Sequence, residues 1–505
     1  MENAEKLAEY TLHSDGIDAN VTISRSFGKA MPDYYIVLPV INESMDIILK
    51  EIRAQLIREV PDKIQALSTS LSTPLKTEFL QMVEEKMRKL LPSLGDQEYK
   101  SYAATLLHDM FGLGILEVLD TDPNLEEIVV NNSKTNVLVY HRSLGWLQTN
   151  QRIDTEGKIE NYAQQIARKV GKQITLLNPL LDAQLVNGDR VNATLAPISQ
   201  KGNTIDIRKF REEPWTLIDF LKNKTMTDEL AAFIWQAMQY ELSMIVAGGT
   251  ASGKTSMLNV LIPFIPPAQR IITIEDTSEL ILPKFMHWVP LLTRLPNAEG
   301  KGEITMLDLL VNSLRMRPDR LVVGEIRRKE EAQTLFEALM TGHSVYATIH
   351  AETAQQVVKR LLSEPINLPD IEVSAMDIVL SMFRQRRLGI RRVLELAEIQ
   401  ETTVAGQTVL KVNNLFEWRA RDDTIQRTVS PSLKIQTKLE LYSGLSASEI
   451  AADIEEKRKI VRWMLKYNIP SIEKIGKISS LYYTNKDALM EVVNGDNTPE
   501  VLEGY

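Results

Sequence analysis

The chain has 505 residues, which corresponds to roughly three domains of ordinary size. Its composition, 44% hydrophobic and 25% charged, is typical of a folded globular protein and excludes wholesale disorder and collagen-like repeats. The 58 lysines and arginines against 67 aspartates and glutamates give a formal charge of −9, so we expect no general attraction to nucleic acid or anionic lipid. The absence of cysteine excludes disulfides and thiolate metal sites.

The first residues, MENAEKLAEYTLHSDG, are polar and acidic and lack the apolar core of a secretory signal. Nowhere do about 18 apolar residues follow one another without a charge, which is the minimum for a membrane span. We therefore expect a soluble or peripheral protein.

Hydrophobic periodicity predicts the order of the domains. Apolar residues at spacings of three and four between about residues 45 and 91 predict amphipathic helices. Further on, short β-like runs with a hairpin turn at Asn187-Gly188 predict a mixed α/β domain. From residue 242 to about 350, apolar β-branched runs alternate with helical segments, which predicts a parallel sheet covered on both faces. The predicted domains are a helical N-terminal segment (1–98), a mixed α/β domain (99–214), a linker (215–229), a core with the parallel sheet (230–392) and a C-terminal β and helical region (393–505).

One segment, GGTASGKT, fills every position of the pattern G-x-x-x-x-G-K-[ST], between an apolar strand and a helix. Its glycines let a loop wrap a phosphate with backbone N–H groups pointing inward, and the helix N-terminus adds partial positive charge. Lys254 would bridge the β- and γ-phosphates, and the Thr255 hydroxyl would bind Mg²⁺. A glycine-rich turn that only connects strand to helix is the alternative. The candidate nucleotide-binding residues here are Gly248, Gly249, Thr250, Ala251, Ser252, Gly253, Lys254, Thr255 and Ser256.

Two more predicted strands end in carboxylates. The strand from Ile271 ends in Glu275 and Asp276, and the strand from Leu321 ends in Glu325. Ligands of open α/β sheets bind at this edge, where a carboxylate can accept a proton from water or hold Mg²⁺. Asp276 could equally cap the segment that follows it.

A fourth predicted strand, SVYATIH, ends in His350. A histidine at a strand end in a pocket can sense or stabilise a γ-phosphate. A histidine with only structural partners is the more frequent case.

Taken together, GGTASGKT, ITIEDTSEL, RMRPDRLVVGEIR and TGHSVYATIHAET resemble the four ordered boxes of the type II/type IV secretion ATPase superfamily. The resemblance continues N-terminally in GLGILEVLDTDPNLEEIVVNN and covers about residues 100–400. EDTSEL followed by LPKFMHWVPLLTR is most similar to the archaeal branch, which drives secretion systems, pili and the archaeal flagellum. The implied fold class is α/β: a RecA-like P-loop NTPase core with a mixed α/β N-terminal domain and a small C-terminal antiparallel and helical extension.

The resemblance also implies a function. Members are hexameric motor ATPases that use ATP and Mg²⁺ at the inner, cytoplasmic face of the cytoplasmic membrane. They drive protein secretion or the assembly of type IV pilus-like filaments with an integral membrane platform protein as partner, and we expect no nucleic acid. Many bacterial relatives carry a four-cysteine zinc element in the C-terminal region, which this chain without cysteine lacks.

Position by position, Lys254 and Thr255 match the phosphate and Mg²⁺ residues of the family, and His350 matches the histidine box. Of the acids, we expect Glu275 to be the general base and Glu325 to face the metal. The sequence alone leaves open which of the two acids activates water. Asp276 and Thr255 are the other metal candidates. Arginines that the family would present to the nucleotide are Arg208 and Arg211 from the N-terminal domain, and Arg294, Arg315 and Arg317 within or across subunits. We also expect a hinge at about 212–229.

Two other functions remain open from the sequence. A RecA-like nucleic-acid translocase would share the P-loop core, but the acidic balance and the absence of an aromatic and basic stripe count against it. A scaffold that only clamps ATP would not need the full set of carboxylates. The arginine-rich stretch 383–392 is interpreted as a solvated helix face or a contact to a neighbouring acidic subunit.

Overall fold

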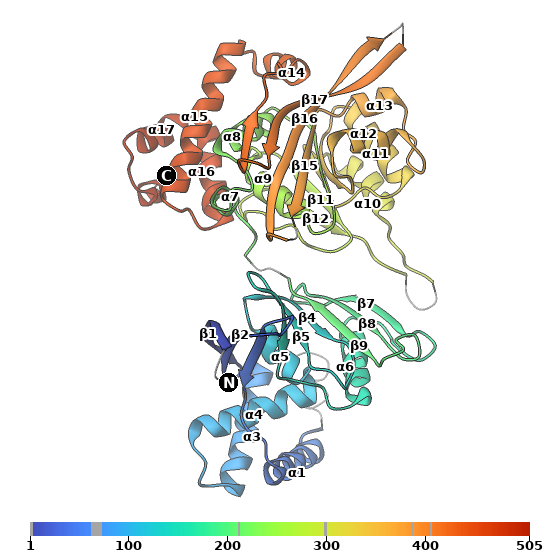
Figure 1. Ribbon diagram of the computed structural model, residues 1–505, viewed down its shortest axis with the longest axis vertical. Helices are drawn as coiled ribbons and strands as arrows, with labels where there is room; N and C mark the ends of the chain where they lie inside the picture. Colours follow the sequence, from blue (N-terminus) through green and yellow to red (C-terminus); the bar gives the residue numbers. More distant parts are fainter. Residues whose placement is uncertain are drawn as a thin grey trace. The chain divides into compact units, whose positions relative to one another are not determined.

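The computed structural model describes residues 4–61, 73–210, 213–296, 300–385, 387–404 and 407–504. The chain divides into two compact units, Met1–Arg211 and Glu212–Tyr505 (Figure 1). The division lies close to the predicted end of the N-terminal domain at residue 214. Among the described helices, none is both long and apolar enough to cross a bilayer.

The first unit is built on a nine-stranded sheet of order β1-β2-β3-β6-β5-β4-β9-β8-β7. Its strands are β1 (Ala4–Ser14), β2 (Ile17–Ser26), β3 (Asp33–Val37), β4 (Leu125–Val130), β5 (Leu138–His141), β6 (Gly145–Thr149), β7 (Leu180–Gln184), β8 (Arg190–Thr194) and β9 (Thr204–Arg208). Its helices are α1 (Glu43–Glu59), α3 (Thr73–Leu90), α4 (Asp96–Phe111), α5 (Ile115–Asp120) and α6 (Glu156–Lys169).

The prediction of a helical segment over residues 1–98 is wrong for its first part, which forms β1, β2 and β3. In β2 the apolar residues Ile17, Ala19 and Val21 alternate with exposed ones, so the strand buries one face only. The predicted helices do follow, as α1 and α3. Because β1, β2 and β3 share a sheet with β4 to β9, the structure shows no division near residue 98.

A buried carboxylate holds these first strands to the rest of the unit. Asp122, fully buried after α5, accepts hydrogen bonds from the hydroxyls of Tyr10 at 2.7 Å and Tyr34 at 2.8 Å. Breaking such a buried network by removing one partner is costly. The acid therefore joins β1 and β3 to the turn before β4.

The second unit contains a second nine-stranded sheet, of order β12-β11-β13-β14-β10-β15-β16-β17-β18. Strands β10 to β15 pair in parallel, and β15 to β18 pair antiparallel. The strands are β10 (Met244–Gly248), β11 (Ile271–Glu275), β12 (Trp288–Leu292), β13 (Arg320–Val323), β14 (Ser344–Ile349), β15 (Ile378–Gln385), β16 (Ile390–Val404), β17 (Gln407–Arg419) and β18 (Thr424–Arg427).

Helices cover both faces of this sheet (Figure 1). On β10, Met244 and Val246 belong to the core on one face, and Ile245 and Ala247 belong to the core on the other. This explains why the strand reads as a continuous apolar run. The helices are α7 (Leu217–Lys222), α8 (Asp228–Gln239), α9 (Lys254–Leu261), η1 (Ile262–Phe264), α10 (Met306–Ser313), η2 (Leu314–Met316), α11 (Lys329–Met340), α12 (Ala354–Leu362), α13 (Asp370–Ser374), α14 (Lys434–Ser443), α15 (Ala447–Lys466), α16 (Ile472–Thr484), α17 (Lys486–Asn494) and η3 (Pro499–Gly504).

The structure places two predicted boundaries differently. The predicted linker 215–229 contains α7, whose Leu217, Ile218 and Phe220 are buried in the core of the second unit. The predicted boundary after residue 392 lies inside β16, which continues the same sheet. Both differences have one cause: the antiparallel strands and the short helix pack on the parallel core, a contact that sequence periodicity does not record.

A buried arginine locks β13 and β14 at the end opposite to their carboxyl termini. Arg320 is fully buried, and its guanidinium donates to Ser344 at 2.8 Å, Tyr346 at 2.7 Å and the Met238 carbonyl of α8 at 2.7 Å. These neutral acceptors hold the planar guanidinium group of Arg320 in one orientation. The register of the two strands that carry the candidate acid and histidine is thereby fixed.

Candidate functional site

The glycine-rich loop follows β10 and leads directly into α9. Gly248 must lack a side chain, because a Cβ atom there would lie 2.3 Å from the Ser252 hydroxyl oxygen and 2.8 Å from the Met382 carbonyl oxygen. Ala251 and Gly253 adopt left-handed backbone conformations, with φ of 58° and 97°. The Ser252 hydroxyl is buried and has no hydrogen-bond partner among the described residues. The loop therefore has the tight, amide-rich form that binds an anion at a helix N-terminus.

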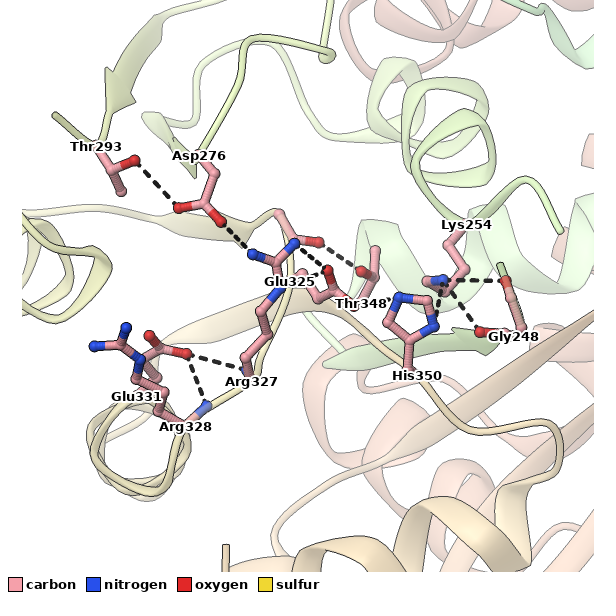
Figure 2. A network of polar contacts seen from close by, with 12 residues as sticks. Gly248, Lys254, Asp276, Thr293, Glu325, Arg327, Arg328, Glu331, Thr348 and His350 are labelled. Carbon is pink, nitrogen blue, oxygen red and sulfur yellow. Dashed lines mark hydrogen bonds and ion pairs between the residues drawn. The ribbon is translucent and has the colours of Figure 1, made fainter. Parts of the chain in front are cut away.

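Lys254 points back over this loop. Its Nζ donates to the carbonyl oxygens of Gly248 at 3.1 Å and Gly249 at 3.3 Å, and it lies 3.5 Å from Nδ1 of His350 (Figure 2). Burial lowers the pKa of Lys254. The ammonium is thus held by neutral acceptors, which a phosphate oxygen would replace favourably.

A chain of polar contacts runs from Lys254 across the edge of the sheet (Figure 2). Nε2 of His350 lies 2.7 Å from Oε1 of Glu325, whose other oxygen accepts from Arg327 Nε at 2.8 Å. Arg327 Nη1 also donates to Asp276 at 2.8 Å. The structure therefore brings together four of the residues that the sequence selected, and Arg327 joins two of the acids.

His350 is half exposed, yet its pKa is lowered, first by desolvation and then by the nearby Lys254 charge. A neutral imidazole fits this position, because it leaves Nδ1 free to accept from Lys254, while Nε2 lies close to Glu325, whose buried Oε1 has no hydrogen-bond partner among the described residues. The histidine thus connects the loop lysine to the acid at the end of β13.

Glu275 lies apart from this chain of contacts. Its side chain is 3% exposed, and Oε1 accepts from the backbone N–H groups of Glu279 and Leu280, both at 3.1 Å. Burial raises the pKa of Glu275 to about 7. The acid stabilises the loop after β11, and its placement gives no contact with Lys254 or His350.

The candidate arginines are spread more widely. Arg294 donates from Nε to the Gly302 carbonyl at 2.6 Å, and Arg315 and Arg317 are exposed at and after η2. Arg208 is exposed on β9 of the first unit, and Arg211 lies outside the described residues. Within the second unit, none of the described contacts joins these candidates to Lys254 or Glu325. Their expected roles stay predictions.

Two residues of the site were not selected from the sequence for a role. Arg327 bridges Glu325 and Asp276, and Thr348 donates to the Gly324 carbonyl at 2.5 Å, which holds the ends of β13 and β14 together. The position of Arg327 two residues after Glu325 was a usable signal. The Thr348 contact depends on the pairing of two strands and leaves no local pattern.

The oxygen donors at this edge suit a hard cation. Thr255 is the second residue of α9 and offers a hydroxyl, and Glu325 and Asp276 offer carboxylates, the kinds of ligand that Mg²⁺ takes. Among the described residues, no group of three or more His, Asp or Glu side chains could hold a metal ion by itself.

Comparison with known proteins gives consistent matches. Residues 152–388 match the family described as "Type II/IV secretion system protein". The uncharacterized protein MJ0900 of Methanocaldococcus jannaschii is 31% identical over 392 residues, which cover 77% of this chain and 70% of that protein. The type IV secretion system protein PtlH of Bordetella pertussis is 30% identical over 302 residues, which cover 53% of this chain and 88% of PtlH. The crystal structure of the pilus retraction motor PilT with bound ADP aligns with 74% of this chain and 92% of PilT, at 18% identity and a TM-score of 0.42.

The buried acid Glu275 predicts a specific pH dependence of stability. Its pKa rises from 4.5 to about 7 on folding, so folding takes up a proton between these values and the free energy of unfolding falls as pH rises through them. Glu275→Gln removes this loss. We expect the melting temperature of the variant, relative to that of the parent protein, to rise by about 5 °C between pH 5 and pH 8. This corresponds to roughly 2 kcal/mol in the free energy of unfolding.

Calorimetry at several pH values measures this difference, with Glu491→Gln as the control because Glu491 is exposed on α17. The control should follow the parent protein at every pH. A Glu275→Gln variant that also follows the parent throughout would show that the acid is already ionised in its buried position.

Proposed function

Because the chain belongs to the type II/IV secretion system protein family, we propose that it is a motor ATPase that couples ATP hydrolysis to protein secretion or to the assembly of type IV pilus-like filaments. The observation that carries the proposal is the contact of Lys254, in a complete phosphate loop, with His350, which in turn contacts Glu325. A loop lysine and a strand-end acid joined in this way are placed to act on the same phosphate.

The loop and Lys254 would bind the β- and γ-phosphates of ATP. The Lys254 ammonium donates to two carbonyl oxygens of the loop. A phosphate oxygen carries a negative charge and makes a stronger, charge-assisted hydrogen bond. When ATP binds, Lys254 would therefore exchange its carbonyl partners for the phosphate.

Thr255 and Asp276 would hold Mg²⁺ together with the phosphates. When bound, Mg²⁺ neutralises charge that develops on the phosphate oxygens. Arg327 now occupies both carboxylates, with contacts of 2.8 Å to Asp276 and 2.6 Å to Glu325. We infer that Arg327 must release Asp276 for the metal to bind.

We assign the general base to Glu325 in place of Glu275. Glu325 is partly accessible, with a side-chain exposure of 15%, and contacts His350 directly. Glu275 is 3% exposed and already accepts two backbone hydrogen bonds. A base must reach the proton that it accepts, and in this arrangement Glu325 satisfies that requirement better.

The assembly and its place in the cell are part of the proposal and rest on the family. We propose a hexamer on the cytoplasmic side of the membrane, bound to an integral membrane platform protein. PtlH is named as a type IV secretion system protein, and we extend a transport role of this kind to the present chain. The competing nucleic-acid translocase has no specific observation in its favour beyond the shared phosphate loop.

Removal of the loop lysine tests the proposed activity. We expect Lys254→Ala to lower phosphate release from ATP by at least about 100-fold, because the group that binds the transferred phosphoryl is lost. Lys477→Ala, at an exposed position of α16, is the matched control and should hydrolyse ATP normally. Unchanged hydrolysis by Lys254→Ala would refute the site. Stimulation of the intact protein by nucleic acid, lost steeply with salt, would favour the translocase.

A pair of acid-to-amide variants tests the assignment of the base. Glu325→Gln should lower kcat by about 10² to 10⁴-fold while ADP still binds, because the amide cannot accept the proton of water. Glu275→Gln should cost less, because its amide oxygen can still accept from Glu279 and Leu280. Steady-state turnover and calorimetric ADP binding measure both effects. A larger loss of kcat in Glu275→Gln than in Glu325→Gln, with ADP binding intact, would show that Glu275 is the general base.

A further inference from the structure

The hairpin formed by β15 and β16 extends beyond the phosphate loop. Gly248, the last residue of β10, is paired with Met382, and β15 continues for three more residues to Gln385. Its antiparallel partner β16 begins at Ile390, so Arg391 lies opposite Arg384 at this overhanging end. The two arginines therefore stand past the carboxyl end of β10, where the loop begins.

Arg391 contacts the loop directly. Its Nε donates to the Ala251 carbonyl at 3.1 Å, although the two residues are 140 positions apart. A Cβ atom at Gly253 would lie 3.6 Å from Cδ of Arg391, so the side chain passes along the last turn of the loop. Ala251 is one of the non-glycine residues with a left-handed backbone, at φ of 58°. Such a conformation persists where neighbouring contacts hold it, and Arg391 supplies one.

The placement of two arginines opposite each other has an electrostatic consequence. Like charges directly opposite on paired strands destabilise a sheet. At the rim of a phosphate loop the same pair raises the positive potential that a nucleotide meets. The prediction of a solvated helix face over residues 383–392 is wrong, because residues 383–385 and 390–392 lie in β15 and β16, and Arg391 lies against the loop.

The strand order gives the bound nucleotide a direction. β14, β13 and β11, which lead into His350, Glu325 and Asp276, lie on one side of β10, and β15 and β16 lie on the other. The γ-phosphate must face the acids, because water attacks it there. With the β-phosphate at the start of α9, the α-phosphate and the nucleoside then extend toward β15 and β16.

We propose that Arg391 is a nucleotide-positioning residue. It holds the Ala251 turn of the phosphate loop and faces the α-phosphate and nucleoside end of the ligand, so that it sets the affinity for ADP and ATP alike. The inference rests on the proposed ATP site and adds a determinant of nucleotide binding on the side away from the acids.

Calorimetric binding of ADP and of a non-hydrolysable ATP analogue, each with Mg²⁺, tests the proposal. Arg391→Ala should weaken both by a similar factor, about tenfold, the size of one charge-assisted hydrogen bond. The KM for ATP should rise by a similar factor while kcat stays within about twofold. Arg391→Lys keeps the charge but not the Nε donor, so its affinity for both nucleotides should lie between that of the parent protein and that of Arg391→Ala. A melting temperature close to that of the parent protein shows that the fold is intact.

The matched control is Arg387→Ala, which removes the same charge from the exposed turn of the same hairpin and should bind both nucleotides normally. An equal loss in the control would mean a general charge effect and would overturn the inference. A loss for the ATP analogue alone would place Arg391 at the γ-phosphate and would also overturn it. Normal binding of both nucleotides by Arg391→Ala, with Lys254→Ala inactive, refutes the inference and leaves the ATPase proposal standing. If Lys254→Ala is fully active, the ATPase proposal itself fails.

Discussion

Parallel strands of one sheet end at the same edge, and the whole candidate site depends on that constraint. β10 delivers the phosphate loop, β13 delivers Glu325, β14 delivers His350 and β11 delivers Asp276 to one edge. The register between β13 and β14 is fixed at the opposite end by Arg320. Residues separated by about 100 positions in the chain are thus brought together by the topology of the sheet and not by their local sequence.

The charged groups of this edge have partners within the protein. Lys254 bonds to loop carbonyls, and Arg327 occupies Glu325 and Asp276. A nucleotide with Mg²⁺ can replace both sets of contacts, because its phosphates can bind Lys254 while the cation binds a carboxylate. A ligand that bonds differently to two arrangements shifts the balance between them, which is the physical requirement for a motor. Arg391 on the other side of β10 would contribute to binding without taking part in that exchange.

The parts of the fold and site that could be predicted are those with a local pattern. The loop GGTASGKT and the apolar strands before Glu275, Glu325 and His350 each lie within a few residues of sequence, and the structure places all of them at one sheet edge. The burial of Glu275 depends on a loop that folds back over it, and the Arg391 contact joins residues 140 positions apart. Both needed the three-dimensional packing. The strands β1 to β3 were missed although β2 carries a period of two, because the charged helical pattern that follows dominated the segment.

A crystal structure of the protein with Mg²⁺ and a non-hydrolysable ATP analogue is the most direct test of the site as a whole. We predict a triphosphate inside the loop, with Lys254 moved from the Gly248 carbonyl onto the phosphates, Glu325 facing the γ-phosphate and the nucleoside on the β15 and β16 side. A nucleotide bound elsewhere, or a loop without phosphate while Lys254 keeps its carbonyl partners, would contradict the central claim.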